Sequence, residues 1–149
     1  MTWKQLLAQR RIKQHRTSRA ELDDLRAAVD VKLKDALSTS ISPDTRFATA
    51  YSAALLLAKM SLACAGYRLD AKSGGHHKTA FEALPLALGS EANMLAHYFE
   101  VCRRKRNEID YDRAFVVSEA DTQEIIERLR ELRELVEDWI AAHYPELAP

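Results

Sequence analysis

The residues best suited to chemistry lie in one short stretch, 103–112, which reads Arg-Arg-Lys-Arg-Asn-Glu-Ile-Asp-Tyr-Asp. Four consecutive cations on one helix cannot all be neutralised by neighbours on that helix. One explanation is structural, because cations near a helix C-terminus offset exposed carbonyl groups. The other is functional, because the guanidinium groups of Arg103 and Arg106, beside the amide of Asn107, are suited to binding phosphate.

Tyr111 follows Arg106 after four intervening residues. Its phenol can donate a hydrogen bond to phosphate or stack on a base, but with an ordinary pKa of about 10 it is a poor general base. Five residues of continuous helix turn the direction by about 500°. The two side chains therefore converge only if the helix ends near Ile109 or Asp110, or if two copies of the chain meet.

Three stretches, taken in order, resemble the HEPN domain family. Arg106-Asn107 followed by Tyr111 is similar to the family motif, in which an Arg, often followed by a polar residue, precedes a His. Residues 46–68 resemble the central helix of the bundle, and residues 76–89 resemble its short connecting helix. The resemblance covers roughly residues 20–143 and departs from the motif at position 111, where Tyr replaces His.

The resemblance implies a protein directed at RNA. It is either a toxin-type, metal-independent endoribonuclease or a degenerate relative that binds RNA or a nucleotide. In active members the His assists proton transfer and the Arg steadies the phosphate, so the implied catalytic pair is Arg106 and Tyr111. The residues expected to bind phosphate or RNA are Arg103, Asn107, Arg46 and His77.

Two of these residues are open to another interpretation. His77 follows Ser-Gly-Gly at a predicted helix start, and it either lies on the surface or faces the cleft and supplies the missing imidazole. Arg46 either joins the anion site, caps a helix or pairs with the acidic last helix. His76 and His77 point apart on a helix and have no partner at ligand spacing, so we expect no metal site and no cofactor.

Two other functions remain open. HEPN domains commonly form homodimers and often occur beside a nucleotidyltransferase, so the alternative is a non-catalytic interaction module that pairs with a nucleotidyltransferase antitoxin. Such a partner could modify Tyr111, although in similar toxins the modified Tyr lies two positions beyond the motif His, where this chain has Arg113. The third interpretation is a structural helical bundle whose basic run only caps a helix.

The elements that must position these residues are predicted to be helices. Capping signals begin four of them, and apolar residues then recur every three or four positions. The helix over 45–65 is apolar on most sides and should be central. A shorter helix runs from His77 to Gly89, where Pro85 forces a kink or a break, and residues 69–75 form a loop. The four signals lie at Ser18–Glu21, Ser42–Asp44, Ser90–Glu91 and Ser118–Asp121.

The length of 149 residues suits a single domain, with a basic extension at residues 1–17 and a bundle at 18–143. We expect an all-α fold: an antiparallel, up-and-down four-helix bundle with a short extra helix and, as an option, an N-terminal helix at 3–13. No strand of useful length is predicted. Apolar runs fall short of the ~20 residues that span a bilayer, and the N-terminus lacks a signal peptide. These features favour a cytoplasmic protein without a membrane span.

Overall fold

Helices make up most of the chain, as the all-α prediction requires. The computed structural model describes residues 1–72, 74–111 and 116–149, and gives no side-chain placement at 110 and 111. Besides the helices it contains two 3-10 turns, η1 (Ser90–Ala92) and η2 (Pro145–Leu147), and two short strands, β1 (Ile12–Gln14) and β2 (Tyr67–Leu69). The helices are α1 (Trp3–Ala8), α2 (Arg19–Ala36), α3 (Pro43–Cys64), α4 (His76–Leu88), α5 (Asn93–Tyr111) and α6 (Glu119–His143).

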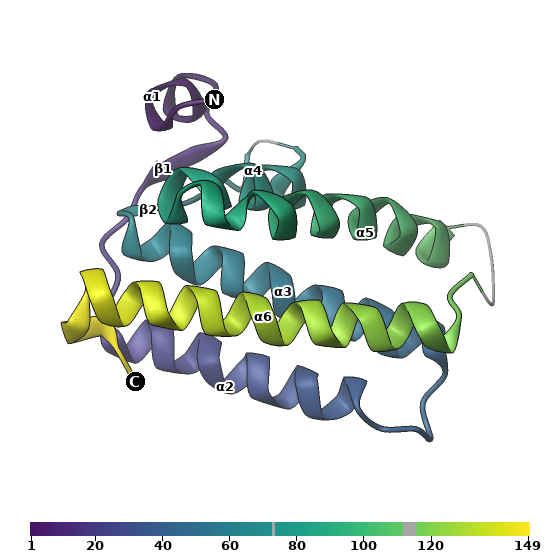
Figure 1. The fold of residues 1–149 in the computed structure, drawn as a ribbon. Helices are drawn as coiled ribbons and strands as arrows, with labels where there is room; N and C mark the ends of the chain where they lie inside the picture. The colour runs from purple at the N-terminus through teal and green to yellow at the C-terminus, as the bar shows by residue number, and fades with distance from the viewer. Residues whose placement is uncertain (73, 112–115) are drawn as a thin grey trace.

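Helix α3 lies at the centre and packs against α2, α4, α5 and α6 (Figure 1). In the same view α2 and α5 run in one direction and α3 and α6 in the other. The length and composition of α3 would also allow it to cross a membrane, but 72% of its most apolar 18-residue stretch is buried inside the protein. The apolar surface of α3 is therefore the core of the fold, as its sequence predicts.

Side chains at the predicted positions cap three of the long helices. Ser18 accepts a hydrogen bond from the Glu21 amide, Ser42 accepts one from the Thr45 amide, and Ser118 forms a reciprocal capping box with Asp121. The reciprocal box expected at Ser18 is not formed, because the Glu21 carboxylate instead accepts from His15 and Thr17. These caps fix where α2, α3 and α6 begin.

The N-terminal segment differs from the predicted helix at 3–13. Helix α1 ends at Ala8, Arg10 adopts a left-handed φ of 56°, and β1 then pairs antiparallel with β2 in the register Ile12 to Leu69. Ile12 is buried with Leu6 in a second, smaller core that also contains Leu62 and Ala83. A strand of three residues is too short for alternation to be recognised in a sequence, which is why the sheet was not predicted.

Helices α4 and α5 each differ from the prediction in one feature. Helix α4 continues through Pro85 to Leu88 instead of breaking there, since Pro85 lies in its last turn and few backbone bonds follow it. Helix α5 begins at Asn93, after the 3-10 turn η1, and not at Ser90–Glu91. It continues to Tyr111, so the end near Ile109 or Asp110 that convergence within one chain requires is not present. Positions 106 and 111 thus differ by about 500° of rotation and do not share a face of α5.

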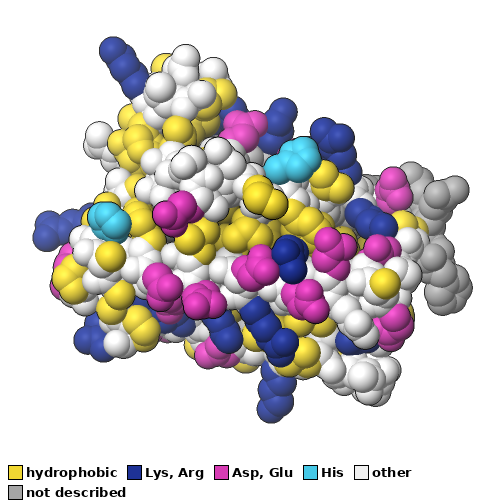
Figure 2. Space-filling model, in the orientation of Figure 1, with side chains coloured by type: hydrophobic (Ala, Val, Ile, Leu, Met, Phe, Trp, Pro, Cys, Tyr) yellow, Lys and Arg dark blue, Asp and Glu magenta, His cyan; other side chains and the backbone are white. Residues whose placement is uncertain are grey.

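One face of the molecule exposes apolar side chains over α5 and α6. Figure 2 shows hydrophobic atoms along the line between these two helices. On α5, Met94 is 85% exposed and Val101 is 50% exposed. The two residues are seven positions apart and therefore lie on the same face of the helix.

Candidate phosphate site

A pocket of about 320 Å³ lies between the first turn of α4 and the C-terminal part of α5. We call it the α4–α5 pocket. It brings together four of the residues proposed from the sequence, three from α5 and one from α4. The three from α5 share a face because they are spaced three and four positions apart. Its lining consists of Gly74, Gly75, His76, His77, Lys78, Arg103, Arg106 and Asn107.

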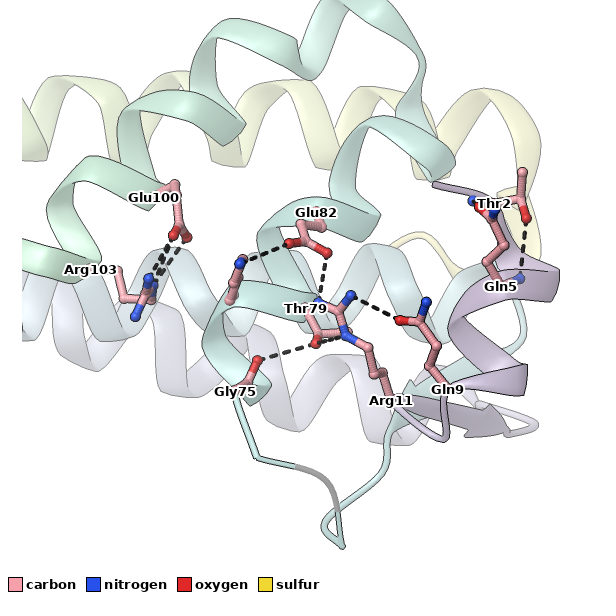
Figure 3. A network of polar contacts seen from close by, with 10 residues as sticks. Thr2, Gln5, Gln9, Arg11, Gly75, Thr79, Glu82, Glu100 and Arg103 are labelled. Atoms are coloured by element: carbon pink, nitrogen blue, oxygen red, sulfur yellow. Dashed lines mark hydrogen bonds and ion pairs between the residues drawn. The ribbon is translucent and has the colours of Figure 1, made fainter.

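Arg106 is held over an aromatic ring. Its guanidinium carbon lies 5.7 Å from the centroid of the Tyr51 ring, a cation–π distance, and Tyr51 on α3 is fully buried. Arg103 forms an ion pair with Glu100 of the same helix, with Nη2 2.7 Å from Oε1 (Figure 3). The hydrogen bonds that Arg103 donates to Glu100 raise the pKa of Arg103. Glu100 therefore offsets part of the Arg103 charge.

His77 is joined to the core through Tyr51. Its Nδ1 lies 3.1 Å from the Tyr51 hydroxyl oxygen. Burial raises the pKa of Tyr51, so this residue is a neutral phenol. Burial, followed by the positive charge of Arg106, lowers the pKa of His77. The imidazole at neutral pH is therefore uncharged.

The direction of this hydrogen bond follows from the burial of Tyr51. A buried hydroxyl without an acceptor is costly, and within the described parts of the chain the atom positioned to accept from it is Nδ1 of His77. We therefore assign the Tyr51 hydroxyl as the donor. Donation from Tyr51 to Nδ1 places the proton of neutral His77 on Nε2. His77 then presents a hydrogen-bond donor, and not a base, at Nε2.

The first turn of α4 adds backbone donors to the same pocket. Gly75 precedes the helix with a left-handed φ of 71° and has no side chain that could accept from the first amides. These amides lie at the positive end of a 13-residue helix, an arrangement that favours anions.

The N-terminal segment fixes the position of this turn (Figure 3). The guanidinium of Arg11 donates to Thr79 Oγ1 at 3.0 Å and to Glu82 at 2.6 Å. Thr79 in turn donates to the Gly75 carbonyl through both its amide and its hydroxyl. Arg11 therefore ties the strand β1 region to the turn that carries His77.

The prediction that Arg46 binds phosphate is wrong, and the alternative, that Arg46 pairs with the acidic last helix, is confirmed. Its side chain is buried between α2 and α6, where Nε donates to the Ala36 carbonyl at 2.8 Å and Nη1 pairs with Glu119 at 3.0 Å. Those bonds occupy the guanidinium in joining three helices, so it is not among the residues lining the α4–α5 pocket.

The side chain of Tyr111 lies outside the described residues, so its predicted catalytic role stays a prediction. The sequence did not single out Tyr51, because its spacing on α3 indicates packing and carries no sign of a hydroxyl directed at His77. It also missed Lys78, which is exposed and 3.9 Å from Glu82. Across the described ranges, no three His, Cys, Asp or Glu side chains are grouped as a metal site.

Comparison with models of protein families, with characterised protein sequences and with solved structures found no match to this chain.

Proposed function

We propose that this protein binds the phosphate backbone of RNA in the α4–α5 pocket. The observation that carries the proposal is the convergence of His77, from α4, with Arg103, Arg106 and Asn107, from α5, on one pocket. A phosphate there receives charge-assisted hydrogen bonds from guanidinium groups, together with donors from the first turn of α4.

Binding without cleavage is the better supported form of this function. Cleavage by the RNA 2′-hydroxyl needs a group that accepts its proton near neutral pH. His77 in the Nε2–H form cannot accept a proton at Nε2, and its lowered pKa keeps it neutral. The same tautomer donates a hydrogen bond to a phosphate oxygen, so His77 acts as a binding residue.

We also propose that the chain is related to the HEPN family and that α2, α3, α5 and α6 form the four-helix bundle of that family. Support comes from the alternating directions of these helices (Figure 1) and from the position of Arg106 near the end of a long helix. It also includes a homodimer formed through the exposed apolar face of α5, which contains Met94 and Val101. Sedimentation of the Val101→Glu variant tests this part, because a charge in the interface should reduce the dimer fraction.

The test of RNA binding compares two arginines from the same basic run. Arg106 lines the pocket, whereas Arg104 is exposed and does not. We expect Arg106→Gln to weaken binding of a fluorescein-labelled single-stranded RNA about tenfold or more, measured by anisotropy. Arg104→Gln should change the affinity less than about threefold, since it alters only the diffuse charge.

The dependence on salt provides a second readout. Removing one phosphate contact lowers the slope of log affinity against log salt by about one, and this should occur for Arg106→Gln. Equal losses of affinity in the two variants would indicate nonspecific attraction of RNA by a basic helix.

A cleavage assay distinguishes binding from catalysis. Incubation of the wild-type protein with the RNA in EDTA, followed by gel analysis, should leave the strand intact. Arg106-dependent cleavage would instead establish a metal-independent ribonuclease.

A further inference from the structure

A second pocket adjoins the α4–α5 pocket. It has a volume of about 360 Å³ and lies between the N-terminal part of α2, the C-terminal part of α3 and strand β2. We call it the β2 pocket. His76 and His77 line both pockets, so the two pockets meet at the start of α4.

The wall of the β2 pocket is largely apolar and partly aromatic. Leu25, Leu62 and Leu69 contribute aliphatic surface, and Tyr67 contributes a ring. That ring stacks on Trp3 with its centroid 4.7 Å away, which holds the ring plane in a fixed orientation. Flat ligand rings bind to such walls by burial and stacking.

The polar side chains of the β2 pocket are one carboxylate, three imidazoles and two cations: Glu21, His15, His76, His77, Lys59 and Arg68. The Glu21 carboxylate accepts hydrogen bonds from His15 and Thr17, both through Oε1, so Oε2 is left to accept from a ligand. The bond with His15 lowers the pKa of Glu21 and keeps its carboxylate ionised. His76 Nε2 is buried and has no hydrogen-bond partner in the described part of the protein, which is costly unless a ligand supplies one.

We propose that the β2 pocket binds the base of the nucleotide whose phosphate lies in the α4–α5 pocket, and that guanine is the preferred base. The inference rests on the proposed phosphate site and adds base recognition to it. Guanine presents two neighbouring N–H donors on one edge, and Oε2 of the ionised, acceptor-only Glu21 carboxylate has two lone-pair sites to receive them. Other bases present fewer donors to that group.

Binding of small ligands to the Trp139→Phe variant tests the proposal. In this variant the remaining tryptophan is Trp3, whose emission reports on the β2 pocket through its stacking on Tyr67. We expect guanosine 5′- or 3′-monophosphate to bind about tenfold more tightly than inorganic phosphate. Inosine monophosphate, which lacks the amino group, should bind more weakly than the guanosine ligand, and the adenosine and uridine monophosphates more weakly still.

Two substitutions separate base binding from phosphate binding. Ala71 is exposed on the rim of the β2 pocket, so Ala71→Phe should reduce guanosine monophosphate binding to the level of inorganic phosphate, whereas Ala71→Ser should not. Glu21→Gln should lower the ratio of guanosine to adenosine monophosphate affinity about tenfold. The ratio of the two affinities does not change if part of the Glu21→Gln protein is unfolded, so it reports on base recognition alone.

The outcomes distinguish the two proposals. If inorganic phosphate binds in an Arg106-dependent way and the nucleotides bind no more tightly, the base pocket is refuted and the phosphate site stands. An Ala71→Phe variant with full nucleotide affinity refutes the base pocket as well. If guanosine itself binds while inorganic phosphate does not, the base pocket stands and the phosphate site fails.

Discussion

At the scale of single residues, the chemistry of the pocket depends on the contact between the Tyr51 hydroxyl and His77 Nδ1. This contact joins a buried phenol on α3 to an imidazole at the start of α4. It decides which nitrogen of His77 carries the proton, and therefore whether the pocket holds a donor or a base. Two neighbouring charges, Arg103 and Arg106, act on the same pair.

Replacing Tyr51 by Phe should change the tautomer of His77. In the wild type we expect the Nε2–H form in 1H–15N NMR spectra of the imidazole above pH 7.5. In Tyr51→Phe the neutral ring should become a mixture of tautomers, and its pKa should rise, because the bond to Nδ1 favours the neutral form. The free energy of unfolding should fall by about 1 kcal/mol. His97, which is exposed, serves as an internal control; an Nδ1–H tautomer in the wild type would contradict the assignment.

Arg46 should contribute to stability and not to RNA binding. Arg46→Met leaves the buried Ala36 carbonyl without its donor, so the free energy of unfolding in urea should fall by about 2–3 kcal/mol. Glu119→Gln should cost less than about 1 kcal/mol, because Glu119 is 60% exposed and can bond to water. The RNA affinity of both folded variants should equal that of the wild type; a selective loss in Arg46→Met would return Arg46 to the binding site.

At the scale of elements, the N-terminal segment and α4 form one unit around Arg11. The side chain of Arg11 reaches two residues of α4, Thr79 and Glu82 (Figure 3). Thr79 donates a hydrogen bond to the Gly75 carbonyl. The Arg11–Thr79 contact therefore also stabilises the turn at Gly75, which lines the α4–α5 pocket.

Removal of this contact should loosen α4 locally. In Arg11→Ala we expect faster hydrogen exchange at the amides of residues 79–82 and in β1, with α2 and α6 unchanged. RNA affinity should fall a few-fold, since the turn at Gly75 that precedes His77 loses part of its support. Arg16→Ala is the matched control, because Arg16 is an exposed cation of the same segment. Unchanged protection of α4 would show that the ion pair does not hold the turn.

At the scale of the whole molecule, the helices could largely be predicted and their contacts only in part. Serine caps and apolar periodicity are local signals, so they located α2, α3 and α6 from Ser18, Ser42 and Ser118. The pairing of Ile12 with Leu69 joins segments far apart in the chain, and no local pattern reports it.

The candidate site could likewise be predicted only in part, because local spacing is visible in the sequence and tertiary contacts are not. The face shared by Arg103, Arg106 and Asn107 follows from helical spacing, so the sequence could assign it. Which partner each arginine meets depends on tertiary packing, and Arg46 therefore received a binding role although it joins helices. The link from Tyr51 to His77 could not be predicted, because it depends on how α4 packs against α3.

An NMR titration of the 15N-labelled protein with inorganic phosphate tests the central claim most directly. We predict saturable shifts at the amides of His76, His77 and Lys78 and at the Arg106 Nε–H group, which disappear in Arg106→Gln and persist in Arg104→Gln. Shifts that spread over the basic N-terminal segment without saturating, or that survive in Arg106→Gln, would contradict a phosphate site between α4 and α5.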